Sequence, residues 1–395
     1  MADHHSINLL DGTFYAGDPY PAYAWMRTHA PAYFDDTNSM WGLSRYDDVV
    51  EASKHPEIFS SADGSRPHTP GDPSMINQDE PRHTRQRRLV NKGFTPRQVA
   101  EHEPRIRAIA NELIDAVAPR GRCDFVQDIA APLPMIIIAE MLGVRTEDRH
   151  LLQHWSDELI KGADGPANVT PAVLAAFDDF VVYTRDVIAA RRVTPRNDLI
   201  SILVHAEIDG DRLSDDEIIF ESLLLMIGGN ETTRNVISGA MEVLIQHTDQ
   251  CAALRADPAQ IPVAVEEFLR WVTPILNMRR TATREVNVHG QTIRAGDQVL
   301  LMYGAANRDV RIFREPDRFD VTREPNPHIA FGFGPHFCLG ASLARLEIRV
   351  MFEELLRRLP DITLTLGAAA VRTPSSFIRG IQRMPVEFAP TSPER

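Results

Sequence analysis

One cysteine stands in a setting that suits metal ligation. Cys338 lies in the stretch FGFGPHFCLG, residues 331–340, where three glycines and a proline predict a tight turn. Apolar residues recur with a period near 3.6 over residues 341–359, which predicts a helix directly after the turn. The unpaired N–H groups at a helix N-terminus favour an anion, so the thiol is biased towards the metal-ligating thiolate. For a lone thiol, the alternative is a buried structural cysteine.

A second group of reactive side chains interrupts the longest helix that the sequence predicts, residues 215–246. Gly228 and Gly229 end an apolar run, and Glu231 and Thr232 follow them. Each glycine costs a helix about 1 kcal/mol relative to alanine, and an unpaired buried carboxylate costs several kcal/mol. A helix tolerates both features more readily where it opens beside a ligand. The alternative is an amphipathic helix with an exposed Glu-Thr pair.

Two further patterns carry charge. His83 and Arg87 are four residues apart, so on a helix they share one face, where paired donors suit a carboxylate ligand. A solvated basic surface is the alternative for this pair. Glu267 and Arg270 are one helical turn apart and can form an ion pair, but a lone E-x-x-R pattern is weak because such pairs are common on surfaces.

The motif F-x-x-G-x-H-x-C-x-G around Cys338 resembles the haem-ligating loop of the cytochrome P450 family, the haem-thiolate monooxygenases. The sequence is therefore identified as a member of this family, with haem b as cofactor and Cys338 as the ligand of the iron. The resemblance implies that Glu231 and Thr232 deliver protons during dioxygen activation, while Gly228 makes room for the oxygen.

The resemblance also assigns further residues around the cofactor. Phe331, Gly332 and Gly340 would frame the thiolate loop. Four side chains would bind the haem propionates, namely His83, Arg87, Arg280 and His336, the last standing where many relatives have arginine. A Glu-Arg-Arg set that locks the core would consist of Glu267, Arg270 and Arg318, the last from the stretch PDRF at residues 316–319.

Electrons must come from another protein, since the sequence has neither a nucleotide-binding fingerprint nor an iron–sulfur cysteine cluster. A ferredoxin with its reductase is the expected partner, docking near Cys338 where His328, His336, Arg345 and Arg349 would meet it. Two alternatives remain open. One is a peroxide-driven enzyme, although members of that kind generally lack the acid–alcohol pair. The other is a non-catalytic haem-thiolate sensor or binding protein.

Over its length the sequence is most similar to actinobacterial P450s that hydroxylate the terminal side-chain carbon of cholesterol and cholestenone, notably at residues 89–95, 227–234 and 377–386. It differs from them at Asn230, where a carboxylate is expected. Macrolide, terpenoid and fatty-acid substrates remain open. The family layout implies an apolar pocket, although each member alone suits an ordinary core position: Met226, Ile227, Ile275, Leu276, Met278, Phe377 and Ile378.

Composition limits the class of protein. The chain has 395 residues, 43% of them hydrophobic, and a net charge of −13, which argues against nucleic acid or an anionic membrane as partner. No apolar run is long enough to span a membrane, the N-terminus lacks the build of a signal peptide, and three scattered cysteines suit a reducing compartment. We therefore expect a cytoplasmic monomer.

Length alone suggests several domains, but the resemblance implies one triangular domain over residues 1–395. The fold class is mainly α with a small β region. Helices are expected at residues 19–28, 46–54, 96–117, 135–142, 147–160, 172–191, 215–246, 262–271 and 341–359. Strands are expected at residues 40–44, 286–293 (broken at 289–290), 298–302 and 362–366. Loops at residues 60–75 and 161–171 would border the substrate pocket, the second as a lid hinge.

Overall fold

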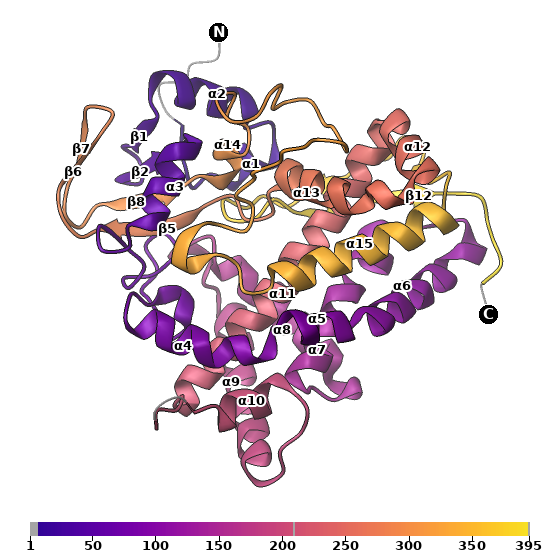
Figure 1. The fold of residues 1–395 in the computed structure, drawn as a ribbon, viewed down its shortest axis with the longest axis horizontal. Helices are drawn as coiled ribbons and strands as arrows, with labels where there is room; N and C mark the ends of the chain where they lie inside the picture. Colours follow the sequence, from indigo (N-terminus) through magenta and orange to yellow (C-terminus); the bar gives the residue numbers. More distant parts are fainter. Residues whose placement is uncertain (1–6, 208–209, 394–395) are drawn as a thin grey trace.

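The computed structural model describes residues 7–207 and 210–393. Helices dominate, and the outline narrows from a broad upper edge to the end that carries α9 and α10, giving a roughly triangular shape (Figure 1). The largest sheet and the β6–β7 hairpin lie on the left, β12 of a smaller sheet lies on the right, and helices fill the space between them (Figure 1). The expected mainly α fold with a minor β region is therefore confirmed.

The long helix α11 (Asp215–Gln246) runs through the middle of the molecule, with α15 (Ala341–Arg358) in front of it (Figure 1). A capping box fixes where α11 begins, because Ser214 and Glu217 satisfy each other's backbone N–H groups. The helix packs against α7 (Pro132–Leu142), α13 (Ile261–Val272) and α15. Apolar side chains from all four helices belong to one buried cluster, so α11 and α15 are held firmly in place.

The largest sheet has the strand order β1 (Ala32–Asp35), β2 (Met40–Leu43), β8 (Gln298–Leu301), β5 (Met278–Ala282) and β3 (Phe59–Ser60). Strands β2 and β8 are parallel, with Met40 opposite Gln298. The hairpin of β6 (Val286–Val288) and β7 (Gln291–Ile293) projects at the sheet's edge (Figure 1). His289 and Gly290 both have positive φ, at 52° and 79°, as a two-residue hairpin turn requires.

A second sheet joins distant parts of the chain. Strand β12 (Pro385–Glu387) lies between β4 (Arg122–Asp124) and β9 (Thr363–Leu364), antiparallel to both. A further pair consists of β10 (Val371–Arg372) and β11 (Ile381–Arg383). The last described strand is therefore the centre of its sheet.

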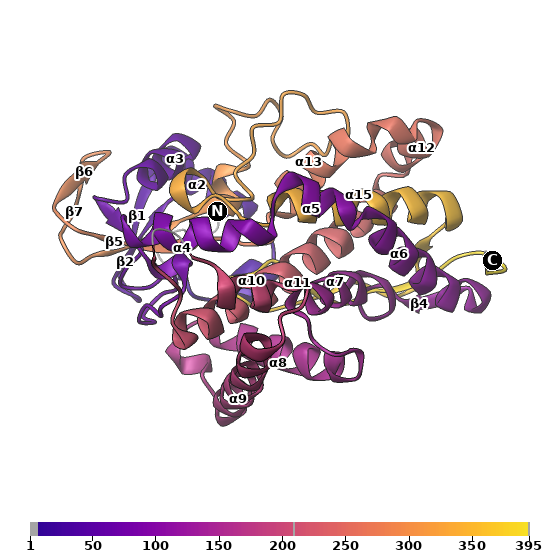
Figure 2. The same cartoon turned by 60° about the horizontal axis from the view of Figure 1, so that its bottom comes forward.

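The remaining helices surround this frame. Helices α8 (Arg149–Gly162), α9 (Pro171–Val193) and α10 (Leu199–His205) form the narrow end, which comes forward in Figure 2. The others are α1 (Gly12–Ala16), α2 (Tyr20–His29), α3 (Tyr46–Lys54), α4 (Arg82–Val90), α5 (Pro96–Glu101), α6 (Glu103–Val117), α12 (Thr248–Ala256) and α14 (Tyr303–Ala306).

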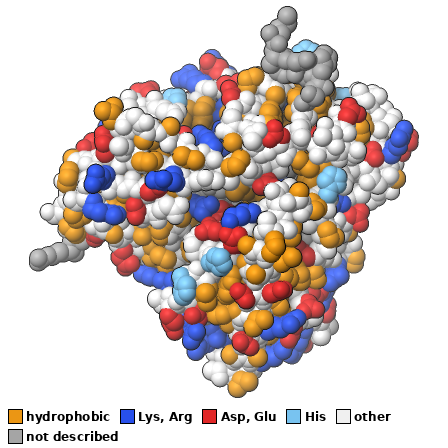
Figure 3. Space-filling model, turned by 180° about the vertical axis from the view of Figure 1, so that it is seen from behind, with side chains coloured by type: hydrophobic (Ala, Val, Ile, Leu, Met, Phe, Trp, Pro, Cys, Tyr) orange, Lys and Arg blue, Asp and Glu red, His pale blue; other side chains and the backbone are white. Residues whose placement is uncertain are grey.

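Two expected elements differ from the structure. The single helix expected at residues 96–117 is divided into α5 and α6, because Pro104 lacks an N–H and opens a new helix at its second position. The strand expected at residues 362–366 is only the two-residue β9. Within the described ranges, the structure has no helix that is both long and apolar enough to cross a membrane. The face opposite Figure 1 mixes acidic and basic side chains (Figure 3).

Candidate active site

The thiolate loop is a tight turn that needs two of its glycines. Gly332 and Gly334 have φ of 72° and 71°, values that side-chain-bearing residues rarely adopt. A Cβ on Gly334 would lie 2.4 Å from the carbonyl oxygen of Ser53, so this position also requires a close backbone approach. The N–H of Cys338 donates to the carbonyl oxygen of Phe331 at 2.9 Å and closes the turn. The sulfur therefore stands on a rigid support just before α15.

Gly340 does not have the unusual backbone angle that is expected of a glycine in this turn. Its φ of −84° is ordinary, and a Cβ built there would meet no described atom within 4 Å. Gly228 on α11 also faces open space of this kind. A side chain at either position would project into this space, so both glycines suit the faces of a flat cofactor and its oxygen ligand.

The electrostatics of Cys338 correct one prediction. Burial raises the pKa of its thiol, while the N–H of Gly340 and the charges of Arg87 and Arg345 lower that pKa without outweighing burial. Proximity to the helix N-terminus therefore does not by itself produce a thiolate. A coordinated metal ion deprotonates a thiol outright, so ligation would supply the charge.

Thr232 and Gly228 are joined across one turn of α11. The Thr232 hydroxyl donates to the Gly228 carbonyl oxygen at 2.7 Å, an interaction that opens helices slightly. Gly229 lies against Ile138 of α7, whose side-chain atoms would be 3.2 Å from an added Cβ. The lack of a side chain at Gly228 thus leaves open space beside α11, and the lack of one at Gly229 lets α7 pack closely.

Glu231 is buried and lies at the inner end of a polar path. It is only 1% exposed, and burial raises the pKa of its carboxyl to about 7 despite the opposing charge of Arg234. Arg234 donates to Glu231 at 2.6 Å and to Asp157 of α8 at 3.3 Å, and Asp157 is half-exposed. Asn230 donates to Ser156 at 3.0 Å and to Glu231 at 3.3 Å. The carboxyl is therefore connected to the surface and titrates near neutral pH.

The four predicted propionate partners come from α4, β5 and the thiolate loop, and they lie together. The rings of His83 (α4) and His336 (thiolate loop) are 4.2 Å apart between centroids. Arg87 of α4 donates to the carbonyl oxygens of Pro335 at 3.0 Å and Phe337 at 2.6 Å. Burial, together with the charges of Arg280, His83 and Arg87, lowers the pKa of His336 to about 2. These four side chains contain no acid, so together they favour an anion.

This group fits a haem carboxylate. Nε2 of His83 is buried and has no hydrogen-bond partner among the described residues, although such an atom normally has one. Arg280 is 5% exposed and donates to the carbonyl oxygen of Arg279 at 2.8 Å, which leaves other N–H groups for a ligand. Donors without partners beside a loop that presents a cysteine match the propionate edge of haem b.

Glu267 and Arg270 form the expected buried pair, but the third arginine was wrongly predicted. Both side chains are 0% exposed, with two hydrogen bonds of 2.7 Å between them. Arg323, and not Arg318, donates to Glu267, at 3.1 Å. The side chain of Arg318 points to solvent beside Glu315, and only its carbonyl oxygen accepts from Arg270, at 3.4 Å.

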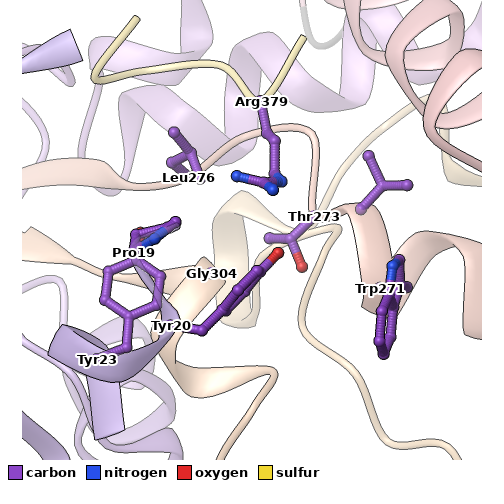
Figure 4. A pocket seen from close by; sticks show the side chains of 9 residues that line it. Pro19, Tyr20, Tyr23, Trp271, Thr273, Leu276, Gly304 and Arg379 are labelled. Carbon is purple, nitrogen blue, oxygen red and sulfur yellow. The ribbon is translucent and has the colours of Figure 1, made fainter. Parts of the chain in front are cut away.

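The pocket prediction needs two corrections. Met226 is fully buried, and about 200° of helical rotation separates it from Gly228, so it lies on the opposite side of α11. Leu276 is buried and lines a separate crevice with Tyr23, Trp271 and Arg379 (Figure 4). Leu224, one turn before Gly228 on the same face and half-buried, was missed although the spacing of four residues indicates it.

The other pocket residues remain proposals with consistent positions. Ile275 and Ile378 pair in an isolated antiparallel bridge, which places two of the predicted segments side by side. Ile227, Ile275 and Met278 are half-buried, and Phe377 is buried.

The expected docking cations are largely neutralised. Arg345 and His328 contact Glu266 at 2.7 Å and 3.0 Å, and together they lower the pKa of this carboxyl to about 2 although burial opposes them. Arg349 pairs with Glu103 at 2.6 Å. These side chains therefore stabilise the fold around the thiolate loop and do not form a free positive surface.

A tight turn that presents a cysteine before α15, a helix with open space at Gly228, and a group of anion-binding donors together define a haem-thiolate protein. The family model described as Cytochrome P450 matches residues 31–360. The chain therefore belongs to the cytochrome P450 family, and it is a monooxygenase with haem b as cofactor.

Individual relatives agree with this assignment. The chain is 47% identical over 397 residues to a steroid C26-monooxygenase from Mycolicibacterium smegmatis, covering 100% of this chain and 98% of the relative. It is 40% identical to a methyl-branched lipid omega-hydroxylase from Mycobacterium bovis, covering 93% and 90%. Among solved structures, the cytochrome P450 CYP109Q5 from Chondromyces apiculatus aligns with a TM-score of 0.90 at 36% identity, covering 98% and 100%. CYP109E1 from Bacillus megaterium in complex with testosterone aligns with a TM-score of 0.88 at 34% identity, covering 94% and 98%.

Proposed function

We propose that this P450 hydroxylates the terminal side-chain carbon of a sterol such as cholest-4-en-3-one. The observation that carries the proposal is the similarity along the whole chain to a steroid C26-monooxygenase. The apolar side chains of Ile227 and Ile275 support it, because they suit a branched hydrocarbon end and offer no partner for a charge. Each buried methylene contributes up to about 0.8 kcal/mol, so a sterol side chain binds well through burial alone.

In this proposal Cys338 ligates the haem iron, and His83, Arg87, Arg280 and His336 bind the propionates. Thiolate-ligated haem supplies the dioxygen activation, which the thiolate assists by favouring O–O cleavage.

The chain's own part in the chemistry is to supply protons and exclude water. Thr232, hydrogen-bonded to the Gly228 carbonyl, presents its hydroxyl on the open face of α11. Glu231 regains its protons from solvent, and Arg234 holds its carboxyl in line with Asp157, which reaches the surface at α8. A carboxyl with a pKa near the working pH suits a group that gives up and regains a proton.

A second substrate class is favoured by one observation. The similarity to a methyl-branched lipid omega-hydroxylase points to terminal oxidation of a branched fatty acid. Both substrates present a branched hydrocarbon end to the iron and differ at the far end, which is a ring system in one and a carboxylate in the other.

The test compares cholest-4-en-3-one with phytanic acid, using the purified holoenzyme and a ferredoxin–reductase system. The sterol is expected to shift the haem spectrum at low concentration and to yield a terminal alcohol. If phytanic acid does both and the sterol neither, the lipid assignment replaces the sterol. If a macrolide or terpene alone is oxidised, both assignments fail and only the P450 chemistry remains.

The redox partner in this proposal is a ferredoxin that docks beside α4. Arg87 contacts the thiolate loop, and its neighbour Arg88 is exposed on the same helix. With Arg345 and Arg349 neutralised, Arg88 is the cation that we expect an acidic ferredoxin to contact. We also infer that the chain acts in the cytoplasm as a monomer. We infer a single domain over residues 1–395, and the continuous apolar cluster from Met75 to Phe388 supports the single domain.

A further inference from the structure

One half-buried arginine, Arg66, joins four segments that are distant in the sequence. Arg66 lies in the loop after β3, and its Nε donates to the carbonyl oxygen of Ala163 at 2.9 Å, just beyond the end of α8. Its Nη1 donates to the carbonyl oxygen of Asn277 at 3.0 Å, next to β5. Its guanidinium carbon lies 3.7 Å from the ring centroid of Phe377, a cation–π contact with the C-terminal loop.

The residue after Ala163 makes a second connection to the same place. Oδ1 of Asp164 accepts hydrogen bonds from the N–H groups of Ser376 at 2.7 Å and Phe377 at 3.1 Å. It also accepts from the hydroxyls of Ser375 at 2.8 Å and Ser376 at 3.0 Å. A carboxylate that accepts several hydrogen bonds fixes its backbone strongly. The segment 161–171 is therefore fastened to the C-terminal loop by Asp164 and to the loop after β3 by Arg66.

The loop that carries Arg66 is held in place by Arg279. Arg279 of β5 donates from its side chain to the carbonyl oxygens of Arg66 at 3.2 Å and Thr69 at 3.1 Å, and its N–H donates to Ser65 at 2.9 Å. The loop after β3 is thus anchored to the central sheet. The segment 161–171 has no such support, so it is the side that is free to move.

Two features show that this connection can open. Gly165, directly after Asp164, has a φ of 121°, which side-chain-bearing residues rarely adopt, so it suits a hinge. Nη2 of Arg66 is buried with no hydrogen-bond partner among the described residues. Opening would return this donor to water, which offsets part of the cost of breaking the other contacts.

We propose that Arg66 and Asp164 form a latch that keeps the segment 161–171 closed over the substrate entrance and must release for a long ligand to enter. The location of the entrance rests on the proposed function, since Phe377 and Ile378 are pocket residues in that proposal. The latch acts as a positioning device, not as a catalytic one. It would slow the entry of bulky ligands, exclude water after they bind, and leave the haem site itself unchanged.

The experiment measures ligand entry and local opening in the holoenzyme. Stopped-flow association of clotrimazole, a bulky ligand of haem iron, is compared with that of imidazole, a small one. The variants are Arg66→Met and Asp164→Ala, with Asp164→Asn retaining the hydrogen-bond acceptor. Asp148→Ala is the matched control, because Asp148 accepts from Arg145 at 2.7 Å and Tyr183 at 3.0 Å at the opposite end of α8.

Removing the latch should accelerate clotrimazole association about tenfold or more, as expected for losing hydrogen bonds to charged groups, and leave imidazole association unchanged. Hydrogen–deuterium exchange should rise at residues 161–171 in both variants. The clotrimazole association rate of Asp164→Asn should lie between those of the parent and Asp164→Ala. The rate of Asp148→Ala should match that of the parent. If Arg66→Met does not fold, Arg66→Lys replaces it. This variant keeps the charge and one carbonyl contact, so the latch requires a smaller increase in its clotrimazole association rate.

Unchanged clotrimazole association and exchange in the folded latch variants would overturn the latch, as would an equal acceleration of imidazole. Azoles bind haem iron whatever the natural substrate is. A parent enzyme that fails to oxidise cholest-4-en-3-one therefore refutes the sterol proposal alone, and the azole kinetics still decide the latch.

Discussion

Arg323 donates from Nε to Oε2 of Glu267 at 3.1 Å and so ties the segment before the thiolate loop to helix α13. Glu267 keeps its pair with Arg270 when Arg323 is removed, so the loss is that of a hydrogen bond to a charged group. We therefore expect Arg323→Met to lower the free energy of unfolding by about 1.5–3 kcal/mol. Arg318→Met, at an exposed side chain, should change it by no more than about 0.5 kcal/mol. Urea unfolding of the two holoprotein variants measures this difference. An equal loss of unfolding free energy in both would show that Arg318 belongs with Glu267 and Arg270 as predicted.

Cys338 is expected to be the axial ligand. Cys338→Ala should abolish the red-shifted band of the reduced, carbon-monoxide-bound protein together with hydroxylation, since no other thiolate lies in the loop. Cys123→Ala and Cys251→Ala serve as controls, because these two cysteines lie on β4 and α12 and not in the thiolate loop. Loss of the band in either control, with retention in Cys338→Ala, would contradict the assignment.

Thr232→Ala should uncouple electron consumption from product formation. The variant loses the hydroxyl on the open face of α11 but none of the apolar walls, so substrate-induced spectral shifts should stay near those of the parent. Losing a positioned proton-transfer group typically costs about 10²–10⁴-fold in rate. Product and hydrogen peroxide per electron pair measure the effect, with Thr233→Ala as neighbouring control. Parent-like coupling in Thr232→Ala would exclude this role.

The stability of the protein should depend on pH through Glu231. Burial raises the pKa of this carboxyl from 4.5 to about 7, so the protonated form is the one that folding favours. Its contribution is fully present below the unfolded pKa and is lost as pH rises through about 7. We expect the parent to lose stability relative to Glu231→Gln between pH 5 and about 8. Parallel stability curves for the two proteins would refute a raised pKa.

Arg88→Glu should weaken the reaction with a ferredoxin. Reversing an exposed charge beside the thiolate loop slows association with an acidic partner and reduces the dependence of the rate on salt. The first electron transfer, followed by stopped flow at low and high salt, measures this. Arg97→Glu, on the separate helix α5 and also exposed, is the matched control. A larger effect in the control would move the docking site to α5.

Much of the site could be predicted from the sequence because its motifs are local. The turn at Gly332 and Gly334, the pair of Glu267 with Arg270, and the acid and alcohol on α11 each depend on residues close together in the chain. Long helices were also predictable, since their apolar periodicity extends over several turns.

What the sequence did not reveal depends on contacts between distant segments. Arg318 and Arg323 are both plausible partners of Glu267 by spacing, and only the path of the loop decides between them. The family layout predicts Met226 in the pocket, but helical rotation puts it in the core and leaves Leu224 beside Gly228. Strands of two or three residues, such as β3 and β9, carry too little alternation to be recognised.

The position of β12 at the centre of its sheet has a consequence for biosynthesis. Its partners β4 and β9 cannot complete their pairing until residues 385–387 have left the ribosome, when almost the whole chain has been made. Translation at about 5–20 residues per second therefore leaves the edge of β4 waiting for its partner for many seconds. Deleting the last dozen residues would leave both edges unpaired.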